Sequence, residues 1–147
     1  KVIQTHRDPA KAVPSLVSLL MRMHPIVEEG RLEQRGPIML RREVAKWSAA
    51  VRRCDKVRES HPGQVLDVVH ADFHARPMEV VEQIYAFIGM DIPEDTRAAL
   101  ARRIEEKPEL QHGAHSYDIR DFGMTPEEAR APFGDYVERF DLVEKSK

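Results

Sequence analysis

The chain has 147 residues, of which 41% are hydrophobic and 33% charged, and its formal net charge is −2. This balance excludes a disordered acidic or basic tail and is typical of a globular protein, so we expect one domain over residues 1–147. The charge is uneven: residues 1–60 carry 13 basic and 7 acidic side chains, whereas residues 61–147 carry 10 and 18. This asymmetry indicates either an anionic ligand near the first part or two solvated faces of opposite charge.

Cysteine content and hydropathy restrict the compartment and the partners. Cys54 is the only cysteine, so no disulfide or thiolate zinc site can form within the chain, and we expect its thiol to be buried and inert. No apolar run approaches the roughly 18 residues of a membrane span, and no signal-peptide pattern occurs. These features predict a cytoplasmic protein without a transmembrane segment. No basic stripe for duplex DNA is present, so a nucleic-acid partner is not expected.

The chain opens with a strand and a helix. Residues 1–6 predict a strand that begins at the first residue, so we expect the chain to start in mid-domain. Asp8 and Pro9 are typical of a helix start, and apolar residues follow at helical spacing. We expect Pro14 to kink this helix or make its first turn irregular, and Pro25 to end it.

The rest of the chain predicts a second strand and more helices. A short helix flanked by loops is expected before Pro37. Residues 65–70 are nearly continuously apolar and β-branched, as in a strand of a parallel sheet that is covered on both faces. The other expected helices span residues 39–59, 77–88, 94–106 and 126–140, the last interrupted at Pro132 and Gly134. The aromatic side chains at helical spacing, Trp47 among them, are expected in the core.

Candidate ligand-binding residues follow the first strand. Arg7 stands at its carboxyl end, where ligands of open α/β sheets bind, and Ser15 lies on the following helix. A planar guanidinium suits two phosphate oxygens, and the helix start would add its positive dipole and free amides. A terminal phosphate monoester is therefore the expected ligand. The alternative is structural, because an arginine before Asp8 can simply pair with this carboxylate.

These motifs resemble the sulfotransferase family that uses 3′-phosphoadenosine 5′-phosphosulfate, in its bacterial-type branch. A strand followed by Arg7-Asp8-Pro9, with Ser15 eight residues after Arg7, is similar to the 3′-phosphate-binding element of the family. The segments 69–77, 84–89 and 115–136 resemble its second strand, its closing Phe-x-Gly motif and its C-terminal signature. The resemblance implies an α/β, P-loop-like sulfotransferase fold, of which this chain is the C-terminal part, mostly helical with two parallel strands.

The resemblance also implies roles for individual residues. Arg7 and Ser15 would hold the 3′-phosphate of the donor and of its product, 3′-phosphoadenosine 5′-phosphate. His70 stands where many relatives place a tyrosine beside the adenine. The glycine- and base-rich loop of cytosolic relatives is not recognisable, and Lys107, His112 or His115 would substitute for it.

The catalytic residues are not assigned, because the phosphosulfate loop and the base of relatives lie before their counterpart of this first strand. We therefore expect the chain to be a fragment of an enzyme. It would bind the donor but would not catalyse sulfuryl transfer alone. Its acceptor would be a hydroxyl or amine of a small molecule, lipid, carbohydrate or peptide. A homo-oligomer or a separate N-terminal half is a further possibility that the sequence leaves open.

Three other hypotheses about the function were considered. A truncated sulfotransferase could serve as a non-enzymatic helical interaction module. A zinc site could combine His70, Asp72 and His74 with the histidines near 115, but residues 70 and 74 are expected on either side of a strand-to-helix turn, so no metal is predicted. A kinase-like enzyme is disfavoured because no Gly-x-x-x-x-Gly-Lys-Ser/Thr sequence occurs.

Overall fold

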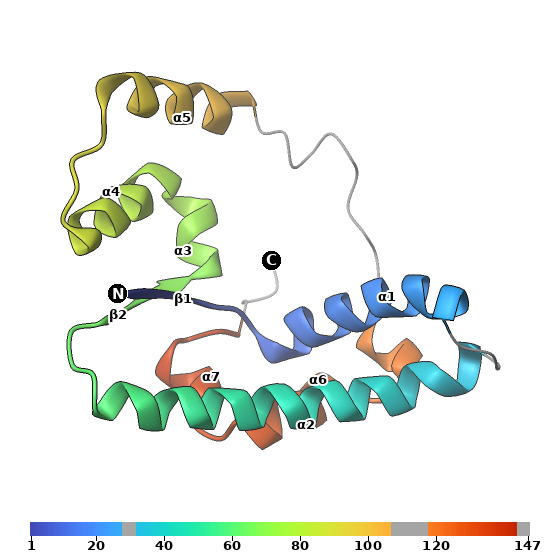
Figure 1. Ribbon diagram of the computed structural model, residues 1–147. Helices are drawn as coiled ribbons and strands as arrows, with labels where there is room; N and C mark the ends of the chain where they lie inside the picture. Colours follow the sequence, from blue (N-terminus) through green and yellow to red (C-terminus); the bar gives the residue numbers. More distant parts are fainter. Residues whose placement is uncertain (28–31, 107–117, 144–147) are drawn as a thin grey trace. The chain divides into compact units, whose positions relative to one another are not determined.

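The computed structural model describes residues 1–27, 32–106 and 118–143 (Figure 1). The chain divides into two compact units. The strand unit comprises Lys1–His6 and His61–Ser116, and the helical unit comprises Arg7–Ser60 and Tyr117–Lys147.

Two parallel strands begin the strand unit. β1 (Val2–His6) pairs with β2 (Val65–Val69) in a register that sets Val2 opposite Val65 and His6 opposite Val69. The expected pair of parallel strands is therefore confirmed, and β2 ends one residue earlier than expected. Parallel pairing requires a crossover between the strands, which is why β1 and β2 lie far apart in the sequence.

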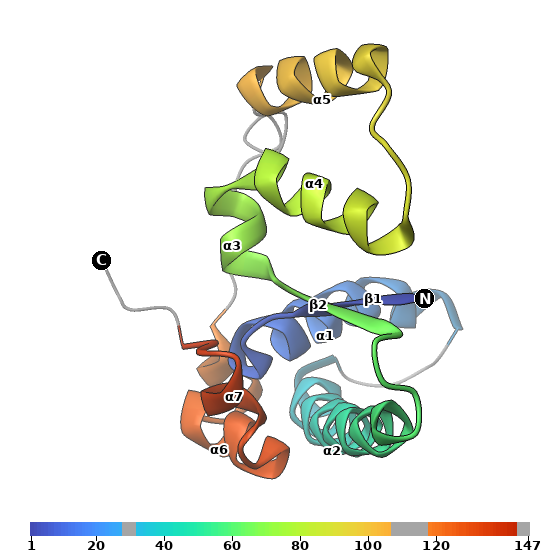
Figure 2. The ribbon, with the colours of Figure 1, turned by 90° about the vertical axis from the view of Figure 1, so that its left-hand side faces the viewer.

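Three helices complete the strand unit: α3 (His70–Ala75), α4 (Pro77–Ile88) and α5 (Glu94–Glu106). Figures 1 and 2 both show them on one side of the strand pair. α4 begins at a proline and ends at Gly89, whose φ of 80° is the left-handed conformation that glycine adopts without a steric penalty. Val80 is the only buried side chain of α4, and the other large apolar side chains of this helix remain partly exposed.

Two long helices, α1 (Pro9–Val27) and α2 (Leu32–Glu59), lie side by side in opposite directions in the helical unit (Figure 1). Both are longer than expected, since α1 continues past Pro25 and α2 includes Pro37. Pro14 and Pro37 each occupy the sixth position of their helix. A proline so close to the helix start removes a single intrahelical hydrogen bond, and the packing of the two helices compensates for this loss.

Short helices after residue 117 pack against the helical pair. They are η2 (Ile119–Phe122), α6 (Pro126–Arg130), η3 (Ala131–Phe133) and α7 (Tyr136–Arg139). Figure 2, which looks nearly along α2, shows α6 and α7 beside it. The core of this unit is apolar and includes Val13, Val17, Leu40, Val44, Ile119, Ala129, Phe133, Tyr136 and Val137.

Two expectations for α2 are wrong. Cys54 is exposed rather than buried. Trp47 is 44% exposed, and its indole N–H donates to the buried carboxylate of Glu43 (3.1 Å). The ring therefore lies at the edge of the core, because the indole N–H needs a polar partner.

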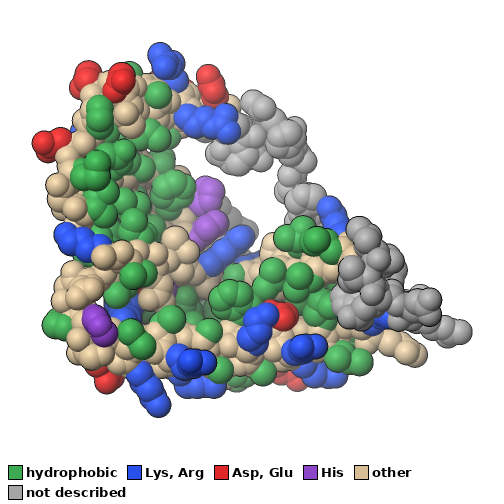
Figure 3. Space-filling model, in the orientation of Figure 1, with side chains coloured by type: hydrophobic (Ala, Val, Ile, Leu, Met, Phe, Trp, Pro, Cys, Tyr) green, Lys and Arg blue, Asp and Glu red, His purple; other side chains and the backbone are tan. Residues whose placement is uncertain are grey.

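Basic side chains lie on the solvent side of α2. Arg41, Arg42, Arg52 and Arg53 are exposed, and Figure 3 shows Lys and Arg side chains along this helix. Among the described residues, no helix is long and apolar enough to cross a membrane.

Candidate functional site

Arg7 is the exposed residue that links β1 to α1. It lies two residues before Pro9, the first residue of α1, so its side chain begins beside the positive end of the helix dipole. Within the part of the chain that the structure describes, the Arg7 side chain has no ion pair or hydrogen bond. Its five N–H donors are thus available to an anionic ligand.

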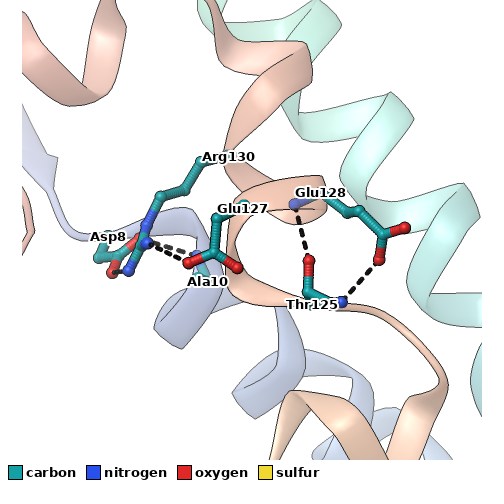
Figure 4. A network of polar contacts seen from close by, with 6 residues as sticks. All are labelled: Asp8, Ala10, Thr125, Glu127, Glu128 and Arg130. Carbon is teal, nitrogen blue, oxygen red and sulfur yellow. Dashed lines mark hydrogen bonds and ion pairs between the residues drawn. The ribbon is translucent and has the colours of Figure 1, made fainter.

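The neighbouring acid, Asp8, is bound elsewhere. Asp8 is 2% exposed, and its carboxylate accepts two hydrogen bonds from the Arg130 guanidinium, from Nε at 3.0 Å and Nη2 at 2.7 Å (Figure 4). A third bond comes from the backbone N–H of Ala10 at 2.9 Å. The hydrogen bond to Asp8 is also the main cause that raises the pKa of Arg130. The structural alternative for Arg7 is therefore wrong, because Arg130 and not Arg7 neutralises Asp8.

The backbone amides at the start of α1 are already bonded. Pro9 has no N–H, the Ala10 N–H donates to the Asp8 side chain, and those of Lys11 and Ala12 donate to the Asp8 carbonyl (both 2.9 Å). The expectation of free amides at this helix start is wrong. An anion bound here would depend on side chains and on the dipole.

Ser15 and Lys11 share one face of α1. Ser15 is half-buried, and Lys11 is exposed one helical turn before it, the spacing that brings side chains together on a helix. Sequence reasoning missed Lys11, although its position midway between Arg7 and Ser15 was a usable signal. Lys11 also contributes to lowering the pKa of Asp118, whose main cause is a hydrogen bond from the backbone N–H of Arg120.

A buried histidine ends β1. The His6 side chain is 0% exposed, and its Nε2 lies 2.7 Å from Oδ1 of Asp67 on β2. This contact joins the two strands near the end of β1, just before Arg7. The sequence analysis placed His6 at the end of the first strand but assigned this residue no role.

The other expected site residues lie in a different unit from Arg7 and Ser15 or outside the described residues. His70 belongs to the strand unit and is the first residue of α3 rather than the last of β2, whereas Arg7 and Ser15 belong to the helical unit. Lys107, His112 and His115 lie outside the described residues. Arg7, two residues before α1, and Lys11 and Ser15, within its first two turns, therefore lie on one continuous segment of the helical unit.

Comparison with known proteins identifies the family. A profile described as "Sulfotransferase family" matches residues 1–94. The chain belongs to the sulfotransferase family. This match covers both strands and α1, and with them Arg7, Lys11 and Ser15.

The fold agrees with this identification. The chain is similar to the crystal structure of sulfotransferase STF9 from Mycobacterium avium, with a TM-score of 0.80 and 22% sequence identity. The alignment covers 99% of this chain and 37% of that sulfotransferase. The expected sulfotransferase fold is thereby confirmed. No curated protein sequence matches the chain significantly.

Proposed function

We propose that this chain supplies the 3′-phosphate-binding part of a sulfotransferase that uses 3′-phosphoadenosine 5′-phosphosulfate. Arg7 would bind two oxygens of the 3′-phosphate, and Ser15 would donate a further hydrogen bond. The complete enzyme would transfer the sulfuryl group to a hydroxyl or amine acceptor. The chain spans 37% of the sulfotransferase that it resembles in structure, so the activity proposed is that of a larger protein.

One observation carries this proposal. Arg7 is exposed and has no partner among the described residues, while the adjacent acid is buried and bound by Arg130. An arginine that only stabilised the helix start would use the nearest carboxylate. Here a second arginine neutralises that carboxylate, which leaves the charge of Arg7 for a ligand.

Lys11 would be the next contact of the phosphate. The charge of an exposed lysine on the same helix face as Ser15 adds to that of Arg7. A phosphate monoester is close to doubly charged at pH 7, so two cations and a hydroxyl are suited to it. Because the α1 amides are already bonded, these side chains would carry the affinity.

The position of the phosphate gives a direct test. We would titrate 3′-phosphoadenosine 5′-phosphate and adenosine 5′-diphosphate into the purified chain by calorimetry. Both nucleotides carry two phosphates, but only the first has one at the 3′ position. The proposal predicts saturable binding of the first that is at least tenfold tighter. Equal affinities, or no binding to a chain whose circular dichroism shows that it is folded, would contradict it.

A second candidate is a non-enzymatic interaction module. The exposed apolar residues of the strand unit favour it, since Val2 on β1 is 57% exposed and Met90 after α4 is 59% exposed. Such side chains suit contact with another protein surface. Analytical ultracentrifugation distinguishes the two candidates: self-association without nucleotide binding would favour the interaction module.

A further inference from the structure

Two histidines meet on the short helix α3 of the strand unit. His70 and His74 are one helical turn apart, and their Nε2 atoms lie 3.1 Å from each other. Their ring centroids are 4.3 Å apart, and the rings are inclined at 55°. The ring of Phe73 meets that of His74 edge-on at 6.0 Å. The sequence pattern placed residues 70 and 74 on either side of a turn, and the structure corrects this by placing both on one helix.

The separation of the two nitrogens suits a shared metal ion. Zinc–imidazole bonds are about 2.0–2.1 Å long. Two nitrogens 3.1 Å apart and both at this distance from one ion subtend an angle of roughly 100° at the ion. This angle lies between those of square-planar or octahedral and of tetrahedral coordination. A hydrogen bond between two neutral imidazoles gives a similar separation, so the experiment must distinguish the two.

No third protein ligand lies nearby on α3. Asp72 stands between the two histidines in the sequence, but its carboxylate pairs with Arg76 at 3.3 Å. Among the residues that the structure describes, no group of three or more His, Cys, Asp or Glu side chains could hold a metal. A metal at this position would have two protein ligands and would complete its coordination with water.

We propose that His70 and His74 form a bidentate site for a divalent transition-metal ion. Imidazole nitrogen suits Cu²⁺, Ni²⁺ and Zn²⁺, and the Irving–Williams order makes Cu²⁺ the tightest of the three. His74 is exposed and His70 half-buried, so an ion can reach both nitrogens from solvent.

Calorimetric titration with CuCl₂, NiCl₂ and ZnCl₂ tests the proposal on the whole chain. We expect one ion per chain, with Cu²⁺ bound most tightly. Because the second imidazole binds intramolecularly once the first holds the ion, His74→Ala should weaken binding roughly 100-fold. His74→Cys should retain Zn²⁺ binding, since a thiolate replaces the lost imidazole.

Two control variants separate this site from other histidines. His61→Gln changes an exposed histidine of the same unit that lies outside α3. The double variant His112→Ala/His115→Ala removes the two histidines that the zinc hypothesis of the sequence analysis adds to His70 and His74. Both should bind the metals as the parent chain does. Binding that survives His74→Ala, that is lost in either control, or that is absent from the parent chain would overturn the proposal.

Discussion

Asp8 and Arg130 are 122 positions apart in the sequence, and two hydrogen bonds join their side chains at 3.0 and 2.7 Å. Asp8 precedes α1, and Arg130 is the last residue of α6. The pair therefore ties the segment that carries Arg7 to a helix near the end of the chain. It also removes the carboxylate that would otherwise compete for Arg7.

Loss of the Arg130 side chain should destabilise the helical unit. Among the residues that the structure describes, Arg130→Met leaves the buried Asp8 carboxylate with one remaining hydrogen-bond donor, the Ala10 N–H. Breaking a buried pair by removing one partner costs about 3 kcal/mol. Urea unfolding followed by circular dichroism measures this change in the free energy of unfolding.

Arg120→Met is the matched control for that variant. Arg120 pairs with Asp118 at 3.4 Å, and both side chains are at least half exposed. An exposed pair contributes about 0–1 kcal/mol, so this change should have little effect. Equal destabilisation by the two variants would refute the structural role given to Arg130.

A close approach explains the glycine in α2. A Cβ atom on the buried Gly36 would lie 2.8 Å from Cδ1 of Phe122. Overpacking of this kind costs about 1–3 kcal/mol, which exceeds the gain of about 1 kcal/mol from helix propensity. Gly36→Ala should therefore lower the unfolding free energy, and adding Phe122→Leu should reverse part of this loss. A more stable Gly36→Ala chain would show that the ring moves aside freely.

The start of α6 is held by a capping box. The Thr125 hydroxyl accepts from the N–H of Glu128 at 3.2 Å, and the Glu128 carboxylate accepts from the N–H of Thr125 at 2.7 Å (Figure 4). Thr125→Ala should cost about 1 kcal/mol, and Thr125→Ser should cost much less because it keeps the hydroxyl. Chemical denaturation of the three chains measures the difference. Equal losses for Ala and Ser would mean that the hydroxyl does not stabilise α6.

Asp118 provides a prediction about pH. Its pKa lies below the ordinary 3.8, chiefly because its carboxylate accepts a hydrogen bond from the N–H of Arg120. A carboxylate with a lowered pKa in the folded state stabilises the fold above its unfolded pKa and loses this contribution as the pH falls through the folded value. The stability difference between the parent chain and Asp118→Ala should therefore be constant above about pH 5 and shrink below pH 4. A difference that persists at pH 2 would contradict this assignment.

The sequence predicted the elements whose signals are local. The Asp8-Pro9 start of α1 and the helix expected over residues 77–88 both depend on signals from neighbours within a few residues. Each is confirmed. The arrangement of these elements in one sulfotransferase fold was predicted from the family resemblance and not from the local signals.

Features that depend on tertiary contacts could not be predicted. The lengths of α1 and α2 were underestimated because each helix continues through a proline, Pro25 in α1 and Pro37 in α2. The Asp8–Arg130 pair was missed because it spans 122 positions. His70 was assigned to a strand because the apolar run gave no signal for the turn into α3.

The most direct test of the central claim is calorimetric titration of 3′-phosphoadenosine 5′-phosphate into three chains: the parent, Arg7→Ala and Arg22→Ala. Arg22 is an exposed arginine of α1 and serves as the matched control. A bidentate guanidinium–phosphate contact is worth about 2–3 kcal/mol, so Arg7→Ala should weaken binding roughly 100-fold while Arg22→Ala should leave it unchanged. An Arg7→Ala chain that binds this nucleotide as tightly as the parent would contradict the account.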